Sequence, residues 1–315
     1  MRNDLLSSED QNVVPPIVRR LRIAILVDDQ ATNGLTAEHG FSLWVEADDQ
    51  RILFDTGLAT ALLTNADRMG ISLNQTDHLV LSHGHDDHTG GIKDVLSRSP
   101  DVHVHCHPAA VLPRYTKRGD QLVSLAMPAA ARRALGDMPP ERLDWTTGSR
   151  SLFPGVGITG PIPRLAHFEE AYGHYLLDAD GTAVDQFEDD MALWLNTSEG
   201  LVVCVGCCHA GLVNTLNSAR RCSHTSHLHA VIGGFHLLRA SDERLQCTLA
   251  ALTELRPDLI IPCHCTGNRF VEALRLEFGG RVSAGRAGAT YVFGGSIDWE
   301  KIDDENRYKP LVCLC

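Results

Sequence analysis

Residues 81–92 read Leu-Ser-His-Gly-His-Asp-Asp-His-Thr-Gly-Gly-Ile. Four potential metal ligands fall within six consecutive positions of this stretch, and they are His83, His85, Asp87 and His88. Neutral imidazole and carboxylate are ligands that divalent zinc, manganese and iron prefer. The glycines favour a turn entering a helix, where the first two histidines could bind one ion while the aspartate and the last histidine reach a second. A solvated polar loop is the alternative.

The segments that precede this loop have a recognisable form. An apolar strand, His78-Leu79-Val80-Leu81-Ser82, leads into it, and residues 51–57 read Arg-Ile-Leu-Phe-Asp-Thr-Gly. His-x-His-x-Asp-His after such a strand, together with Phe-Asp-Thr-Gly, resembles the metallo-β-lactamase superfamily, over residues of about 21 to 294. The resemblance implies an α/β fold, the αββα four-layer sandwich. It also implies that Asp55 supports the metal loop and is not itself a ligand.

The hydrophobic pattern fits that architecture. Strands are predicted at 22–27, 41–46, 51–54, 78–81, 101–106, 191–197, 201–205, 229–232 and 259–261, and helices at 58–69, 91–97, 211–220, 241–255 and 267–278. Two strand-rich halves that each carry helices indicate two packed sheets with helices outside. We expect a flexible leader at 1–20, one domain at 21–295 and a C-terminal tail at 296–315.

A stretch rich in proline, glycine and charge separates the two halves. Loops this long in a compact domain are usually functional, so residues of about 108–190 are predicted to form an insert that covers the active site. Its cations are either ordinary solvated charges or contacts for an anionic substrate, with Arg114 and Lys117 as the predicted contacts. The full set is Arg114, Lys117, Arg118, Arg132, Arg133 and Arg164.

Two later histidines follow strand-like segments and precede small residues. His209 lies in Gly-Cys-Cys-His-Ala-Gly, and His264 lies in Ile-Pro-Cys-His-Cys-Thr-Gly. By resemblance, His209 completes the first site with His83 and His85, and His264 completes the second with Asp87 and His88. A buried structural histidine is the alternative for each.

One ligand expected from the resemblance is missing. The superfamily usually places a bridging aspartate at the end of the strand between these two histidines. Here that strand ends Val-Ile-Gly-Gly-Phe-His, and no Asp or Glu occurs from Cys207 through Ser241. Either the ions share only a hydroxide or a substrate oxygen, or His236 points into the site as a metal or substrate contact.

Four short motifs narrow the resemblance to one branch of the superfamily. They are Ala-Glu-His-Gly-Phe-Ser at 37–42, Gly-Cys-x-His-Ala-Gly at 206–211, Ile-Gly-Gly-Phe-His-Leu at 232–237 and Ile-Pro-Cys-His-Cys-Thr-Gly at 261–267. They resemble the branch named for dihydropterin-ribofuranosylaminobenzene 5'-phosphate synthase, many of whose bacterial members are described as metal-dependent hydrolases. In the first motif, Glu38 and His39 are either substrate contacts at the mouth of the site or parts of a cap or turn.

Composition limits the partners. The formal net charge of −12 gives no indication of a surface for nucleic acid or an anionic membrane, and we expect neither as a partner. The longest apolar runs are too short to span a bilayer, and residues 1–20 lack the apolar segment of a secretory signal. Most of the ten cysteines lie in apolar runs, where a reduced thiol behaves as a small hydrophobe. We therefore expect a cytoplasmic protein with reduced thiols.

These observations predict an enzyme. The expected cofactor is two divalent metal ions, zinc (Zn2+) first, with Mn2+ or Fe2+ also open. A metal-bound hydroxide formed near neutral pH would attack a small anionic ester, a phosphoester or lactone, and Asp87 could also accept the water's proton. The alternatives are a synthase-type transferase that forms a C–N bond with loss of pyrophosphate, and a non-catalytic metal-bound sensor.

Overall fold

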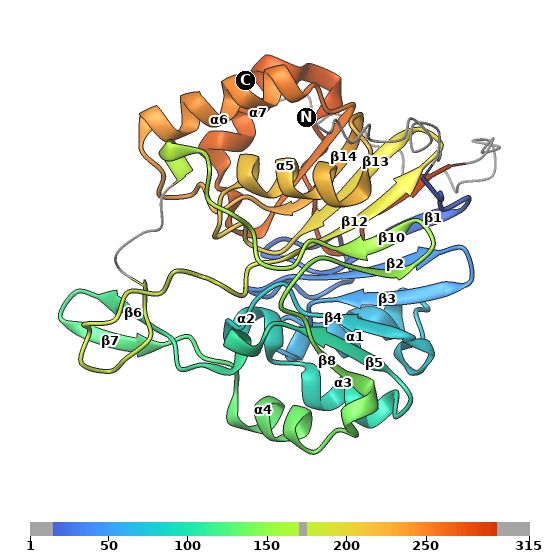
Figure 1. Ribbon diagram of the computed structural model, residues 1–315, viewed down its shortest axis with the longest axis vertical. Helices are drawn as coiled ribbons and strands as arrows, with labels where there is room; N and C mark the ends of the chain where they lie inside the picture. The colour runs from blue at the N-terminus through green and yellow to red at the C-terminus, as the bar shows by residue number, and fades with distance from the viewer. Residues whose placement is uncertain (1–14, 170–174, 295–315) are drawn as a thin grey trace, which may run out of the picture.

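The computed structural model describes residues 15–169 and 175–294. Two large sheets lie face to face at its centre (Figure 1). The first sheet has seven strands, in the spatial order β16 (Thr290–Phe293), β1 (Leu21–Val27), β2 (Ser42–Ala47), β3 (Gln50–Phe54), β4 (His78–Val80), β5 (His103–Cys106) and β8 (Leu143–Trp145). The strands from β16 to β3 pair antiparallel, and those from β3 to β8 pair parallel.

The second sheet has six strands. Their order is β15 (Leu259–Cys263), β14 (Leu228–Gly234), β13 (Gly200–Val205), β12 (Ala192–Thr197), β10 (Val156–Ile158) and β9 (Arg150–Phe153). Every residue of β12 and β13 is buried, which explains why their sequences are apolar runs without alternation. The two strands form the hairpin expected across residues 198–200.

Helices cover the outer faces of both sheets. Against the first sheet pack α1 (Thr60–Arg68), α3 (Ile92–Arg98) and α4 (Ala129–Gly136), with the one-turn α2 (Asp86–Thr89) at its edge. Against the second sheet pack α5 (Leu212–Ser223), α6 (Asp242–Leu255) and α7 (Asn268–Phe278). One apolar cluster fills the space between the sheets, and one lies under each helical layer. The predicted αββα sandwich is confirmed. Within the described ranges, no helix is long and apolar enough to cross a membrane.

The predicted boundaries of the leader and of the insert both differ from the structure. Residues 15–20 are not a loose leader, because Val18 is buried and its amide donates to the carbonyl of Asn196. Residues 1–14 and the predicted tail at 296–315 lie outside the described residues.

The insert predicted at about 108–190 is too broad. Strand β8 joins the first sheet, and β9 and β10 join the second, so much of this stretch belongs to the sandwich. Among the described residues of this stretch, a third, three-stranded sheet stands apart from the sandwich, formed by β11 (Tyr175–Leu176), β6 (Tyr115–Arg118) and β7 (Gln121–Ser124). Figure 1 shows the β6–β7 hairpin projecting beside the loop that carries α2.

The ends of the central strands position the chemistry-bearing residues. The parallel strands β4, β13, β14 and β15 bring their carboxyl ends to one edge of the sandwich, which is where ligands bind in open α/β sheets. Several of the residues that follow central strands hold a left-handed backbone although they are not glycine, namely Asp55, Cys208, His236 and His264. A left-handed backbone is strained in residues other than glycine, and such strain concentrates at functional sites, where the surrounding packing stabilises it.

Candidate metal centre

Three imidazoles meet at the centre of this edge, and we call His83, His85 and His209 the first trio. Their ring centroids lie 4.7 to 4.8 Å apart. Within the described residues, Nε2 of His83, Nε2 of His85 and both ring nitrogens of His209 are buried without a hydrogen-bond partner. A buried polar atom left without a partner costs about 1–3 kcal/mol. Three converging lone pairs fit a divalent cation, which would satisfy them together.

The electrostatics of the first trio keep its rings neutral. Burial lowers the pKa of His83 and His209 well below the ordinary value, and neighbouring imidazoles lower both further. Burial likewise lowers the pKa of His85, against an opposing effect of Asp87. Neutral imidazole is the form that binds a metal.

A hydrogen-bond chain behind the loop fixes which nitrogen of His83 faces inward. The Ser82 hydroxyl donates to Asp55 Oδ2 at 2.6 Å, so the same hydroxyl oxygen accepts from Nδ1 of His83 at 2.9 Å. Nε2 of His83 then keeps its lone pair for an ion. Asp55 Oδ1 accepts the Ser82 amide at 2.7 Å. Asp55 therefore holds the start of the loop through both of its carboxylate oxygens.

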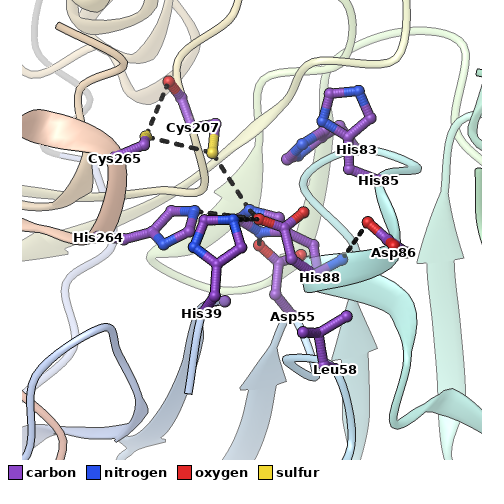
Figure 2. Close-up of polar contacts among 12 residues, drawn as sticks. His39, Asp55, Leu58, His83, His85, Asp86, His88, Cys207, His264 and Cys265 are labelled. Atoms are coloured by element: carbon purple, nitrogen blue, oxygen red, sulfur yellow. Dashed lines mark hydrogen bonds and ion pairs between the residues drawn. The ribbon is translucent and has the colours of Figure 1, made fainter. Parts of the chain in front are cut away.

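Asp87, His88 and His264 form a second trio beside the first. Nε2 of His264 lies 3.3 Å from Asp87 Oδ2, and Nε2 of His88 lies 3.8 Å from the same oxygen. On their other sides, Nδ1 of His88 donates to Asp55 and Nδ1 of His264 donates to Asp29, each at 2.7 Å. A carboxylate behind a ligating imidazole fixes its orientation and raises its basicity. Figure 2 shows His88 and His264 converging from opposite sides.

The second trio carries charge. Burial alone would lower the pKa of His88, but Asp87 and Asp55 outweigh it and raise that pKa. Burial is likewise outweighed at His264, whose pKa is raised well above its usual value by Cys265, Asp29 and Asp87. The pKa of Asp87 lies well below the ordinary value because the neighbouring imidazoles overcome the effect of burial. The structure thus brings together all six residues predicted as ligands.

A pocket of about 620 Å³ opens onto both trios. Tyr175 and His236 line it, with the Tyr175 hydroxyl 3.2 Å from Nε2 of His236. The His236 ring lies 4.4 Å from that of His209, so His236 does face the site. Burial raises the pKa of Tyr175, which keeps its phenol protonated. Only the tertiary structure reveals Tyr175, because no sequence motif surrounds it.

The prediction that Arg114 contacts the substrate is wrong. Its side chain is 1% exposed and forms ion pairs with Asp185 at 2.7 Å and Asp189 at 2.6 Å. Asp189 also accepts the amide of Gly84 at 2.7 Å. The Arg114–Asp189 ion pair therefore supports the loop that carries His83 and His85. Both charges are buried, and a buried charge is stable only when it is paired.

Glu38 is also not a substrate contact. Its two carboxylate oxygens accept the amides of Leu58 and Ala61, each at 2.9 Å. It caps the start of α1, where amides lack partners within the helix. The adjacent His39 does line the pocket, with Nε2 3.4 Å from Asp87 Oδ2 and Nδ1 3.3 Å from Asp29 Oδ2.

The remaining cations differ in whether their side chains reach the pocket. Lys117 and Arg118 are neighbours on β6, so their side chains point to opposite faces, and of these two only Arg118 lines the pocket. The predicted substrate contact of Lys117 is therefore not supported by its position. Arg132 and Arg133 lie exposed on α4, and Arg164 donates to the carbonyls of Glu169 and Gln186. Arg239 lines the pocket as well and was not predicted.

Two thiols and one carboxylate of the centre were also missed. Cys207 and Cys265 line the pocket, with their sulfur atoms 3.3 Å apart, and Asp29 holds His264. The two cysteines lie one or two positions from a predicted histidine, and Asp29 is the second residue after β1. That position was the available signal, but the apolar surroundings of the cysteines favoured a packing role.

Comparison with known proteins agrees with this geometry. A sequence model of the metallo-beta-lactamase superfamily matches residues 35–264. The chain belongs to this superfamily. Its members bind metal ions, and groups of histidine, cysteine and aspartate side chains at this site could hold them.

Relatives are found in sequence and in structure. The 7,8-dihydropterin-6-methyl-4-(beta-D-ribofuranosyl)-aminobenzene-5'-phosphate synthase of Methanocaldococcus jannaschii is 29% identical over 285 residues, covering 85% of this chain and 96% of the relative. The crystal structure of Tm1679, a metal-dependent hydrolase of the beta-lactamase superfamily, has a TM-score of 0.73 at 30% identity, over 87% of this chain and all of that one. YhfI of Bacillus subtilis, at 11% identity and a TM-score of 0.53 over 87% of this chain and 100% of YhfI, shares the fold.

Proposed function

We propose that the protein is a dinuclear metal-dependent hydrolase of a small anionic ester, a phosphoester in the first instance. One observation carries the proposal. The unpartnered nitrogens of the first trio and the carboxylate-backed second trio face each other at the floor of one pocket. Two bound divalent ions, zinc in the first instance, would supply an activated water and polarise a phosphoryl oxygen, which makes the phosphorus atom easier for that water to attack.

The chain's own residues orient the reactants. The first trio would hold one ion and the second trio the other, with Asp87 Oδ2 placed to accept a proton from the attacking water. Tyr175, whose hydroxyl faces the pocket, would donate a hydrogen bond to a substrate oxygen. The buried floor excludes bulk water, which strengthens each electrostatic contact.

His39 is suited to protonate the leaving group. Its side chain is 66% exposed at the pocket mouth. The hydrogen bond to Asp29 raises its pKa, against the opposing effect of partial burial and with further support from Asp87. A proton held on Nε2, 3.4 Å from Asp87 Oδ2, is available to an oxygen that leaves towards the solvent.

The pocket walls indicate the substrate class. Two exposed cations, Arg118 and Arg239, line it together with the apolar side chains of Leu58, Val123 and Leu238. Guanidinium groups bind phosphate through paired hydrogen bonds. A phosphate ester with a flat or apolar leaving group fits this combination.

A matched pair of variants tests the anion site. Arg118→Ala should raise KM for a chromogenic phosphoester about 10-fold or more, equivalent to about 1.4 kcal/mol, with a smaller change in kcat. Lys117→Ala, on the opposite face of the same strand, should leave both constants unchanged. The assay uses metal-loaded protein and a panel of phosphomonoesters, phosphodiesters and lactones. No turnover of any panel member above the rate of a His83→Ala variant would overturn the hydrolase proposal.

The similarity to the archaeal synthase supports one alternative. In this alternative the protein would join a dihydropterin to a ribosylaminobenzene phosphate with loss of pyrophosphate, and the two arginines would hold the phosphates. Pyrophosphate release that requires both organic partners would establish it. Hydrolysis of simple esters without a second substrate favours the first proposal.

A further inference from the structure

Strand β14 ends without a carboxylate, and other atoms already fill the space next to its last residue, Gly234. A side-chain carbon added at Gly234 would lie 2.6 Å from Cys265 Sγ and 2.6 Å from the carbonyl oxygen of Gly206. No Asp or Glu occurs from Cys207 through Ser241. The sulfur of Cys265 therefore occupies the space that a side chain at Gly234 would enter, and a ligand shared by two ions would have to come from outside β14.

The sulfur of Cys207 lies between the two trios. It is 3.2 Å from Nε2 of His88, in the second trio. The ligand atoms of Cys207, His83 and His88 all lie within 4.8 Å of one another. The same holds for Cys207 with His209 and His236, and for Cys207 with His264 and Cys265. The sulfur of Cys207 thus lies within reach of ligand nitrogens from both trios, and Figure 2 shows its contacts with His88 and with the neighbouring Cys265.

The other buried cysteines provide a contrast. Cys106, Cys204, Cys208 and Cys263 all belong to the three apolar clusters of the core. Cys207 is equally buried, at 3% exposure, but belongs to none of these clusters and is not in a disulfide. Its sulfur faces imidazole nitrogens and the Cys265 thiol, so apolar packing does not account for its position.

We propose that Cys207 Sγ is the ligand shared by the two ions, in place of a bridging carboxylate. This inference rests on the metal centre of the proposed function. When a bound ion displaces the thiol proton to solvent, the resulting thiolate carries the negative charge that a bridging aspartate would supply, and its sulfur has lone pairs for two ions. As a soft ligand it favours zinc, cobalt or iron over magnesium, calcium or manganese.

Cobalt substitution tests the proposal without an activity assay. The full chain, reduced and free of metal, is titrated with Co2+ and followed by near-ultraviolet absorption and electron paramagnetic resonance. Wild-type protein should bind two ions, show thiolate-to-cobalt charge transfer and show magnetic coupling between the ions. Cys207→Ser should lose the charge-transfer band and the coupling, and should bind the second ion more weakly by about 10-fold or more.

Three further variants test whether Cys207 itself, and not a neighbouring cysteine or a folding defect, causes these changes. Cys208→Ser is the matched control, one residue along, and should keep the band and the coupling. Cys265→Ser should keep both as well. Cys207→Asp should restore two coupled ions without the band, which also covers the case in which the serine variant does not fold.

The failures are distinguishable. A charge-transfer band that survives in Cys207→Ser and disappears in Cys265→Ser overturns the assignment to Cys207. Two bound ions in the wild type without any such band overturn it too, but leave the metal centre intact. Absence of stoichiometric Co2+ binding in the wild type overturns the proposed function itself.

Discussion

The two trios of the metal centre lie side by side but are built differently. Among the described residues, no ring nitrogen of the first trio forms an ion pair with a carboxylate, and one or both nitrogens of each ring are buried without a partner. The ring of His209 is held by stacking on Phe187, with centroids 4.0 Å apart. In the second trio, every ring nitrogen faces a carboxylate, from Asp55, Asp29 or Asp87.

This difference shows how surroundings give one residue type two behaviours. Neutral rings without partners lose nothing when an ion arrives, because no hydrogen bond or proton must be displaced. Rings held between carboxylates are already satisfied, so an ion must displace a proton and compete with existing ion pairs. We therefore expect the first trio to bind its ion more tightly than the second.

The largest effect should follow from removing two members of the first trio. His83→Ala combined with His209→Ala leaves one ligand there, so elemental analysis should find that the tighter ion is lost, and turnover should fall by orders of magnitude. His103→Ala, an exposed histidine on β5, is the control and should retain the metal. Full metal retention in the double variant would contradict the assignment of the first trio.

Asp87→Ala should separate metal content from turnover. It removes the only carboxylate ligand of the second trio and a proton acceptor, so turnover should fall by orders of magnitude while the first ion stays bound. Asp86→Asn is the control, because Asp86 lines the same pocket but points its carboxylate at the Asp87 amide, a contact that Asn can keep. Wild-type rates in Asp87→Ala would mean that this residue is neither ligand nor base.

A smaller effect should follow from the carboxylate behind His264. Asp29→Asn removes the charge that orients this ring, so the second ion should bind about 10- to 100-fold more weakly and the first ion unchanged. Asp258→Asn is a matched control, since Asp258 accepts from His227 and His229 away from the pocket. Equal weakening of both ions in Asp29→Asn would show that the trios are not independent.

The smallest expected difference between the two trios lies in how their affinity for metal depends on pH. The pKa of His264 is raised, so its proton persists to higher pH and an ion must displace it. Affinity at the second trio should therefore rise as pH increases towards and through that pKa, with protons released on binding. The pKa values of the first trio are lowered, so its affinity should stay flat across the neutral range. Calorimetric metal titrations in buffers of different ionisation enthalpy measure the affinity and the number of protons released at each trio. Identical proton release at the two trios would contradict the proposed difference in their protonation.

The sequence by itself determined the fold and the place of the predicted ligands. Apolar strands followed at once by His83, His209 or His264 are local patterns, and the alternation of strands and helices leaves few ways to pack them. Because the parallel strands end at one edge, residues after each strand had to meet there. That these residues bind metal stays a prediction.

Only the tertiary structure decided which neighbours each group has. Asp29 reaches His264 across 235 positions, and Asp189 holds Gly84 across 105. Composition could not show that Arg114 is buried in an ion pair, or that Cys207 faces nitrogens and not carbon. Charge, protonation and exposure depend on what surrounds a side chain in space, and those surroundings come from distant segments that no local pattern specifies.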